Sequence, residues 1–203
     1  MRRISSLIFP GLIFAGTLLL TVGSLHAQVD IAVGGSTVWS PKNPTATEAY
    51  TPPPLRGADY PMASVQTMLT DRLGVNVEGA FRYNDGLYNG FQKFRPILYD
   101  ANAVYRSKLP HKMKLDLMAG IGGETLIFYN EFFSCNNSTG ACRSFTNDTH
   151  FLLHGGGGLR YDFWRRFFVR PEAHYDYVID NFEFHSHNLF RVGASIGYTF
   201  GSQ

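Results

Sequence analysis

The sequence predicts an all-β fold: an eight-stranded antiparallel up-and-down barrel that crosses a membrane, preceded by a cleavable signal peptide. Three observations support this. Residues 1–27 have the pattern of an export signal, the remaining chain alternates apolar and polar side chains with a period of two, and long and short connections alternate along it. The composition, 44% hydrophobic with 17% charged residues, excludes a disordered chain. Two cysteines in 203 residues exclude a disulfide-rich scaffold.

The first 27 residues are expected to be removed after export. Arg2 and Arg3 form a short positive segment, residues 4–22 are mostly apolar, and Ala27 supplies a small residue at the cleavage point. An uncleaved membrane helix is the alternative, because the apolar run is almost long enough to span a bilayer. No cysteine lies near the cut, which excludes a lipid-anchored N-terminus. We therefore divide the chain into a signal peptide, 1–27, and a barrel domain, 28–203.

The charge of the mature chain argues against a nucleic-acid partner. The full sequence has 18 Lys and Arg against 16 Asp and Glu, and both excess cations lie in the signal peptide. Residues 28–203 are thus neutral, and no basic tract is interleaved with aromatic residues.

Eight segments of about ten residues show period-two alternation, the length that a tilted strand needs to cross a bilayer. The predicted strands are 29–39, 60–69, 75–83, 95–106, 113–125, 149–161, 167–177 and 187–200. Their connections alternate strictly between long and short. The long ones are 40–59, 84–94, 126–148 and 178–186, and the tight ones are 70–74, 107–112 and 162–166. In a membrane barrel the tight turns face the periplasm and the long loops face outward.

One face of the predicted strands is apolar and the other carries charges that are balanced in sign. We expect the charged face to form a closed interior network. Its predicted members are Glu78, Arg82, Asp100, Arg106, Asp116, Glu124, Arg160, Arg170, Glu172, His174, Asp176 and Arg191. Alternation alone does not say which face is inside. Aromatic residues near strand ends and a glycine-rich polar face favour apolar residues toward lipid, whereas the reverse facing would give a soluble periplasmic barrel that binds an apolar ligand.

The last predicted strand resembles the C-terminal strand of bacterial outer-membrane proteins. Alternate apolar residues run back from an aromatic residue near the chain end, and the resemblance implies that the barrel-assembly machinery reads them as a signal. They are Val192, Ala194, Ile196, Tyr198 and Phe200. Gly201, Ser202 and Gln203 follow the aromatic residue on which many family members end. With the signal peptide and the strand number, the mature chain is similar to the small outer-membrane barrel family that includes the protein A, X, W and opacity-type barrels.

The longest loop contains both cysteines. Cys135 and Cys142 form an even pair in an exported chain, so we expect a disulfide that closes a small loop. In the chain-entropy model such a loop contributes roughly 2–3 kcal/mol to stability. The bond would either stiffen a binding tip or simply protect the loop from proteolysis.

The sequence assigns no catalytic, cofactor-binding or metal-binding residue. Loop imidazoles are usually solvated, and the one credible ligand group is His185 and His187 with Asp180 and Glu183 nearby. A lipid-modifying enzyme using His185, Glu183 and Ser186 is the alternative function, although no spacing matches a known catalytic set. A conducting pore is not expected, because side chains fill an eight-stranded barrel.

We therefore expect a monomeric outer-membrane barrel with both termini in the periplasm and with lipids and the assembly machinery as partners. Its function would be structural, or adhesion-like through the extracellular loops 40–59 and 126–148, whose ligand the sequence does not identify. Two substitutions test which face of the strands meets lipid. Ala103→Arg should block assembly, and Asn102→Ala should be mild.

Overall fold

The computed structural model describes residues 28–41, 55–88, 91–135, 142–181, 183–184 and 186–201. The predicted signal peptide lies outside these residues. Nine strands are described: β1 (Gln28–Trp39), β2 (Arg56–Met68), β3 (Leu73–Phe81), β4 (Gly86–Tyr88), β5 (Gln92–Leu109), β6 (Met113–Cys135), β7 (Cys142–Trp164), β8 (Phe167–Val178) and β9 (Asn188–Phe200). Among the described residues, no helix is long and apolar enough to cross a membrane.

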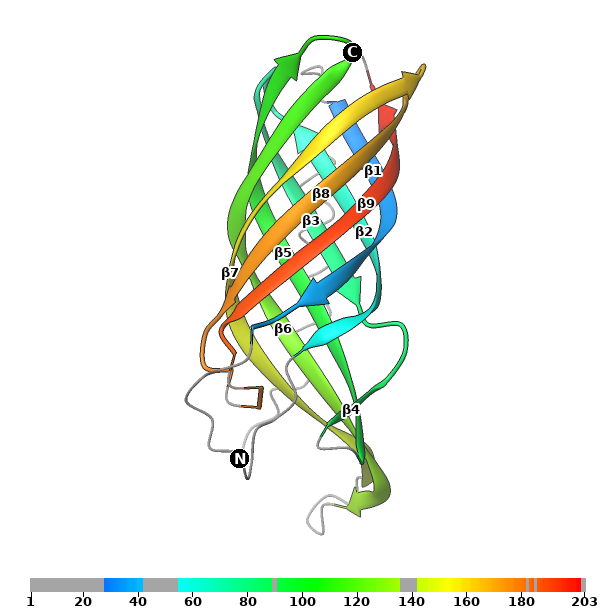
Figure 1. Cartoon of the computed structure of the whole chain (residues 1–203), viewed down its shortest axis with the longest axis vertical. Helices are drawn as coiled ribbons and strands as arrows, with labels where there is room; N and C mark the ends of the chain where they lie inside the picture. Colours follow the sequence, from blue (N-terminus) through cyan, green and yellow to red (C-terminus); the bar gives the residue numbers. More distant parts are fainter. Residues whose placement is uncertain are drawn as a thin grey trace, which may run out of the picture.

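Eight of the strands close into one antiparallel barrel (Figure 1). Each strand pairs with its neighbour in sequence, β9 pairs with β1 from Val29↔Phe200 to Trp39↔Phe190, and β3 pairs with β5. Closure leaves no free sheet edge, so the backbone donors and acceptors of the wall are satisfied within it. The predicted eight-stranded up-and-down barrel is confirmed. The short β4 is additional and pairs only with the beginning of β5.

The two ends of the barrel differ in their connections. The turn end carries the short connections β2–β3, β5–β6 and β7–β8. The first residue of β1, Gln28, and the last residue of β9, Phe200, also lie at this end. The loop end carries the other connections, and in Figure 1 it lies at the bottom, where the β6–β7 hairpin projects furthest. Because long and short connections alternate along the chain, as predicted, the short ones lie together at the turn end and the long ones at the loop end.

The outer face is apolar and the inner face is largely polar. Along β3 the outward side chains of Val75 and Val77 are 41% and 59% exposed, whereas the alternate residues Asn76 and Glu78 are buried. The same alternation runs through β5, β8 and β9. Because a water-soluble barrel would bury its apolar face, this facing suits lipid and contradicts the alternative of a soluble barrel with an apolar interior.

The structure corrects the prediction of a loop over residues 126–148. Strands β6 and β7 continue through this region as a paired ribbon as far as Cys135↔Cys142, with one irregularity after Tyr129. The aromatic and β-branched residues of 126–133 suit a pleated strand and override the nearby turn-forming residues. The 84–94 connection likewise contains a strand pair, β4 with β5.

The interior is also less uniform than predicted. A buried apolar group fills its loop end. Polar side chains predominate in the middle and at the turn end, where Met68, Val104, Met118 and Phe168 are also buried. The apolar group includes Tyr60, Phe94, Leu126, Phe128 and Phe184. This apolar group was not predicted alongside the charged interior network.

Candidate functional site

A closed ion network lies at the turn end of the interior. Arg106 contacts Asp116 at 2.6 Å through Nε and Asp30 at 3.0 Å through Nη2. Arg160 contacts Asp30 at 2.6 Å and donates to the hydroxyl of Thr199 at 2.7 Å. This layer pairs two guanidiniums with two carboxylates, all almost fully buried, so its charges balance. It links β1, β5, β6, β7 and β9.

A second polar group, here called the central cluster, lies next to it toward the loop end. It comprises Glu78, Asp100, Asn102, His154, Arg170, Glu172, His174, Asp176 and Arg191, all of them buried. Arg170 approaches Glu172 at 2.7 Å, and Arg191 approaches Glu78 at 2.8 Å and Asp100 at 3.5 Å. The cluster holds four carboxylates against two guanidiniums, which leaves two excess negative charges when the imidazoles are neutral.

Three residues of the central cluster form a chain of contacts inside the barrel, from β5 through β7 to β8. Nδ1 of His154 lies 2.5 Å from Oδ1 of Asn102, and Nε2 of His154 lies 2.9 Å from Nδ1 of His174. The amide nitrogen of Asn102 donates to carboxylate and amide oxygens of Asp100 and Asn76, which fixes the orientation of the amide. Nε2 of His174 is buried and has no hydrogen-bond partner.

Glycines provide the space for this chain. His174 is directly opposite Gly156 across the β7–β8 pair, and a Cβ on Gly156 would lie 2.8 Å from Nδ1 of His174. Gly120 stands between Asn102 and His154 in the register of β5, β6 and β7. The absence of both side chains lets residues two strands apart make contact.

An aromatic group closes the loop end. The ring of Tyr88 in β4 lies edge-on to Phe94, Phe128 and Phe184, with ring centroids 5.3–6.4 Å apart. Its hydroxyl donates to the carbonyl of Glu183 at 2.9 Å. Further into the barrel, Glu124 accepts a hydrogen bond from Asn181 at 2.9 Å. The apolar layer separates the central cluster from the loop end.

The structure places the predicted network residues in three groups. Arg106, Asp116 and Arg160 lie in the turn-end layer, and Glu124 lies beneath the aromatic group. Arg82 is apart from the rest, half-buried, with its guanidinium 5.2 Å from the centre of the Phe94 ring. The remaining predicted members all belong to the central cluster: Glu78, Asp100, Arg170, Glu172, His174, Asp176 and Arg191.

Asp30, Asn102, His154 and Thr199 also belong to these groups but were not among the predicted network residues. The alternation of inward and outward side chains along each strand could have identified all four, since each occupies an inward position of its strand. The contact between His154 and His174 had no signal within either strand, because it depends on how β7 and β8 pair.

The residues of the predicted alternative enzyme do not come together as a catalytic set among the described residues. The Ser186 hydroxyl lies 2.5 Å from that of Ser40, and Glu183 pairs with His150 at 3.0 Å. His187 contacts the carbonyl of Val178 through Nδ1 at 2.9 Å. His185 lies outside the described residues.

The other predicted features have defined places. Cys135 and Cys142 are directly opposite in the β6–β7 ladder, and the disulfide itself stays a prediction. The residues of the predicted assembly signal all point outward from β9 or lie partly covered on its outer face: Val192, Ala194, Ile196, Tyr198 and Phe200. Their recognition also stays a prediction.

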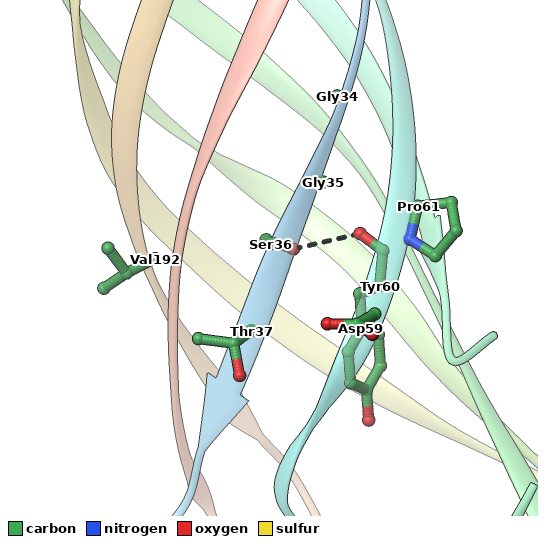
Figure 2. Close-up of a pocket in the computed structure, with 8 residues that line it drawn as sticks. All are labelled: Gly34, Gly35, Ser36, Thr37, Asp59, Tyr60, Pro61 and Val192. Atoms are coloured by element: carbon green, nitrogen blue, oxygen red, sulfur yellow. Dashed lines mark hydrogen bonds between the residues drawn. The ribbon is translucent and has the colours of Figure 1, made fainter. Parts of the chain in front are cut away.

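An open groove of about 460 Å³ lies on the outer wall over β1, β2 and β9. Gly34 and Gly35 leave it without side chains in the middle, and Thr37, Pro61 and Val192 border it (Figure 2). Beneath it, the Ser36 hydroxyl donates to the carbonyl of Tyr60 at 3.5 Å. Asp59 is the one charged side chain among the lining residues, so the groove offers no catalytic set.

Comparisons with known proteins support the fold. No model of a known protein family matches the sequence, and no functionally curated protein matches it. Solved structures do match. The attachment invasion locus protein Ail of Yersinia pestis matches with a TM-score of 0.56 and 12% identity, over 87% of this chain and 100% of Ail.

Two further structures match to the same degree. Neisserial surface protein A matches with a TM-score of 0.55 and 16% identity, over 89% of this chain and 99% of that one. The outer membrane protein OprG of Pseudomonas aeruginosa matches with a TM-score of 0.56 and 13% identity, over 89% and 99%. The chain therefore has the fold of small bacterial outer-membrane β-barrels, as the resemblance of its last strand predicted.

Proposed function

We propose that this protein lies in the bacterial outer membrane and acts as a surface-interaction barrel, with the projecting β6–β7 hairpin as its main contact element. The observation that carries the proposal is the exposure of this hairpin. Residues 144–149 of β7 are exposed in succession, whereas Leu126 and Phe128 of the paired β6 are buried in the apolar group. The β6 strand thus holds the base of the hairpin to the barrel, and the successively exposed residues of β7 are available to a partner.

The chemistry of the hairpin and its surroundings favours a contact of mixed character. Phe145 on the hairpin is 43% exposed and Phe91 in the neighbouring connection is 75% exposed. The charged residues near them have both signs, with Arg95 and Asp85 paired at 2.7 Å. Exposed aromatic rings beside hydrogen-bonding groups are typical of protein recognition surfaces.

Ail has been crystallised with the heparin analogue sucrose octasulfate. A sulfated polyanion would need a cationic surface, whereas the described rim of this chain is of mixed charge, with Asp59, Asp85 and Asp148 exposed beside Lys93 and Arg95. We therefore propose a protein partner rather than a sulfated glycan for this chain.

Shortening the hairpin tests the proposal. Residues 130–144 are replaced by Asn-Gly, which keeps the Tyr129↔Phe145 pair and suits a two-residue β-turn. Bacteria that display the parent or the variant are compared for adherence to an epithelial monolayer and to immobilised heparin. We expect the variant to lose monolayer adherence, with little heparin binding by either.

Two single substitutions refine the test. Phe145→Ser should reduce adherence, whereas Leu109→Ser, an exposed apolar residue at the turn end, should leave it unchanged. Equal adherence of the parent and the shortened variant would contradict the role of the hairpin. Strong retention of the parent on heparin would instead indicate a polyanionic ligand.

A further inference from the structure

We propose that the central cluster holds one divalent metal ion of the zinc type, bound by Glu78, Glu172 and His174. One ring nitrogen of His174 and one carboxylate oxygen from each glutamate lie within 4.8 Å of one another. All three residues are buried. Imidazole and carboxylate groups are ligands that Zn²⁺ accepts, at about 2.0–2.2 Å, so small side-chain movements would bring the three ligands into range.

The tautomers of the two imidazoles direct a free lone pair into this site. Oδ1 of Asn102 accepts hydrogen bonds only, so Nδ1 of His154 must carry a proton. In a neutral ring Nε2 of His154 is then the acceptor for Nδ1–H of His174. The remaining nitrogen of His174, Nε2, is left as an acceptor, and it faces Oε2 of Glu172 at 3.8 Å.

That lone pair is otherwise unsatisfied. His174 is 3% exposed, and its Nε2 atom has no hydrogen-bond partner. A lone pair directed at a carboxylate oxygen is unfavourable unless a cation lies between them. The carboxylates of Glu78 and Glu172 each contact one guanidinium through one oxygen, Arg191 at 2.8 Å and Arg170 at 2.7 Å, and the second oxygen of each carboxylate has no cationic partner among the described residues.

The charge of the central cluster agrees with a divalent ion. Its carboxylates, on Glu78, Asp100, Glu172 and Asp176, exceed its guanidiniums, on Arg170 and Arg191, by two. The turn-end layer is already neutral. A dication would balance the central cluster without a further side chain, and buried charges in proteins are paired or bind metals.

The environment of His174 resembles the outer shell of a metal site. A histidine ligand usually donates the N–H of its second ring nitrogen to a neighbouring acceptor, which orients the ring. Here Nδ1 of His174 meets His154, which in turn meets Asn102. The other possible ligand group, Asp100, His154 and Asp176, is less suited, because both nitrogens of His154 are engaged in this chain.

The proposed ion would connect opposite walls of the barrel. Glu78 lies on β3 and the other two ligands lie on β8, and these strands are four positions apart in either direction around the sheet. A metal that binds the folded barrel and not the unfolded chain raises stability in proportion to the logarithm of its concentration over Kd. The inferred role is a structural crosslink.

Metal content after folding tests the site. The mature chain is folded from urea into detergent with Zn²⁺ present, so that access to the closed interior does not limit binding, and is then dialysed against metal-free buffer. We expect one zinc per chain by mass spectrometry of the metal. Glu172→Gln and His174→Gln should each reduce this at least tenfold, whereas His111→Gln, an exposed histidine at the turn end, should retain it.

Two further measurements keep the outcome decisive. The gel shift between unheated and boiled samples shows whether each variant has folded. X-ray absorption of the zinc-loaded parent should show nitrogen and oxygen ligands with scattering from one imidazole, which needs no variant. Zinc-free parent protein, zinc lost with His111→Gln, or a zinc shell without imidazole would each overturn the proposal.

Discussion

Nε2 of His154 lies 2.9 Å from Nδ1 of His174 inside the barrel, although the two residues are on different strands and not directly opposite in register. The two rings meet edge to edge, with centroids 5.2 Å apart and planes inclined by 26°. The contact joins Asn102 on β5 to β8 through β7 and orders the middle of an otherwise ionic interior.

Asn102→Ala should now be destabilising, contrary to what the sequence alone suggests. The substitution removes the acceptor of His154 and leaves a buried N–H without a partner, which costs about 1–3 kcal/mol. Urea unfolding of the folded barrel in lipid vesicles measures this. Asn102→Leu keeps a side chain of similar shape without an acceptor and so separates the loss of the hydrogen bond from the loss of volume. An unchanged midpoint for the alanine variant would show that the contact is not important.

Gly156→Ala should disturb the same contact from the opposite side. The added Cβ would lie 2.8 Å from Nδ1 of His174 and 3.2 Å from Nε2 of His154, so the imidazoles must move apart. Crowding of this kind costs typically 1–3 kcal/mol. Gly155→Ala is a matched control, because its Cβ would meet nothing within 4 Å. Equal unfolding midpoints for the two variants would show that the imidazole pair does not limit the space at Gly156.

Arg160→Met should weaken the turn-end layer. Arg160 contacts Asp30 at 2.6 Å and Asp162 at 2.7 Å, and its guanidinium lies 3.8 Å from the centre of the Phe168 ring. Removal of one member of a buried ion pair costs about 3–5 kcal/mol, since the partner charge is left behind. The double variant with Asp30→Asn should lose less than the sum of the two single losses. Additive losses in urea unfolding would indicate that the two side chains are not coupled.

Alternation and connection lengths were sufficient to predict the barrel, because a strand side chain can face only lipid or the interior. The same alternation explains why every predicted network residue except Arg82 lies in the buried interior. What parity does not determine is the register between strands. It therefore gave no indication that His174 reaches over Gly156 to His154, or that Glu78 on β3 faces Glu172 on β8.

The apolar layer at the loop end was missed for a different reason. Tyr60, Phe94 and Phe128 alternate in step with the charged residues nearer the turn end, so they share the inner face. Aromatic residues near strand ends were assigned to the interface with lipid, and this assignment does not hold for Tyr60, which points inward. Phe94 and Phe128 lie in segments that were predicted to be loops. The facing of a strand-end aromatic residue must be taken from parity rather than from its residue type.

Phe94→Ala should open this apolar layer. Phe94 is buried and contacts the rings of Tyr88 and Phe184, so truncation leaves a cavity and costs about 3–5 kcal/mol. Phe91→Ala, at an exposed ring three residues earlier, should change stability by no more than about 0.5 kcal/mol. Urea unfolding in vesicles compares the two. Similar midpoints would mean that the aromatic group contributes little to the stability of the barrel.

Ala103→Arg tests the lipid facing directly. Ala103 points outward from β5, in register with Val75 on one neighbouring strand and Ala119 on the other, well away from both ends of the barrel. An arginine near the bilayer midplane costs about 2–4 kcal/mol in a transmembrane barrel, whereas Ala103→Leu adds volume without charge. We expect the arginine variant to be depleted from the outer-membrane fraction and to lose the difference in migration between unheated and boiled samples. The leucine variant should behave as the parent does. If both variants assemble equally well, that face of β5 does not meet lipid at this depth.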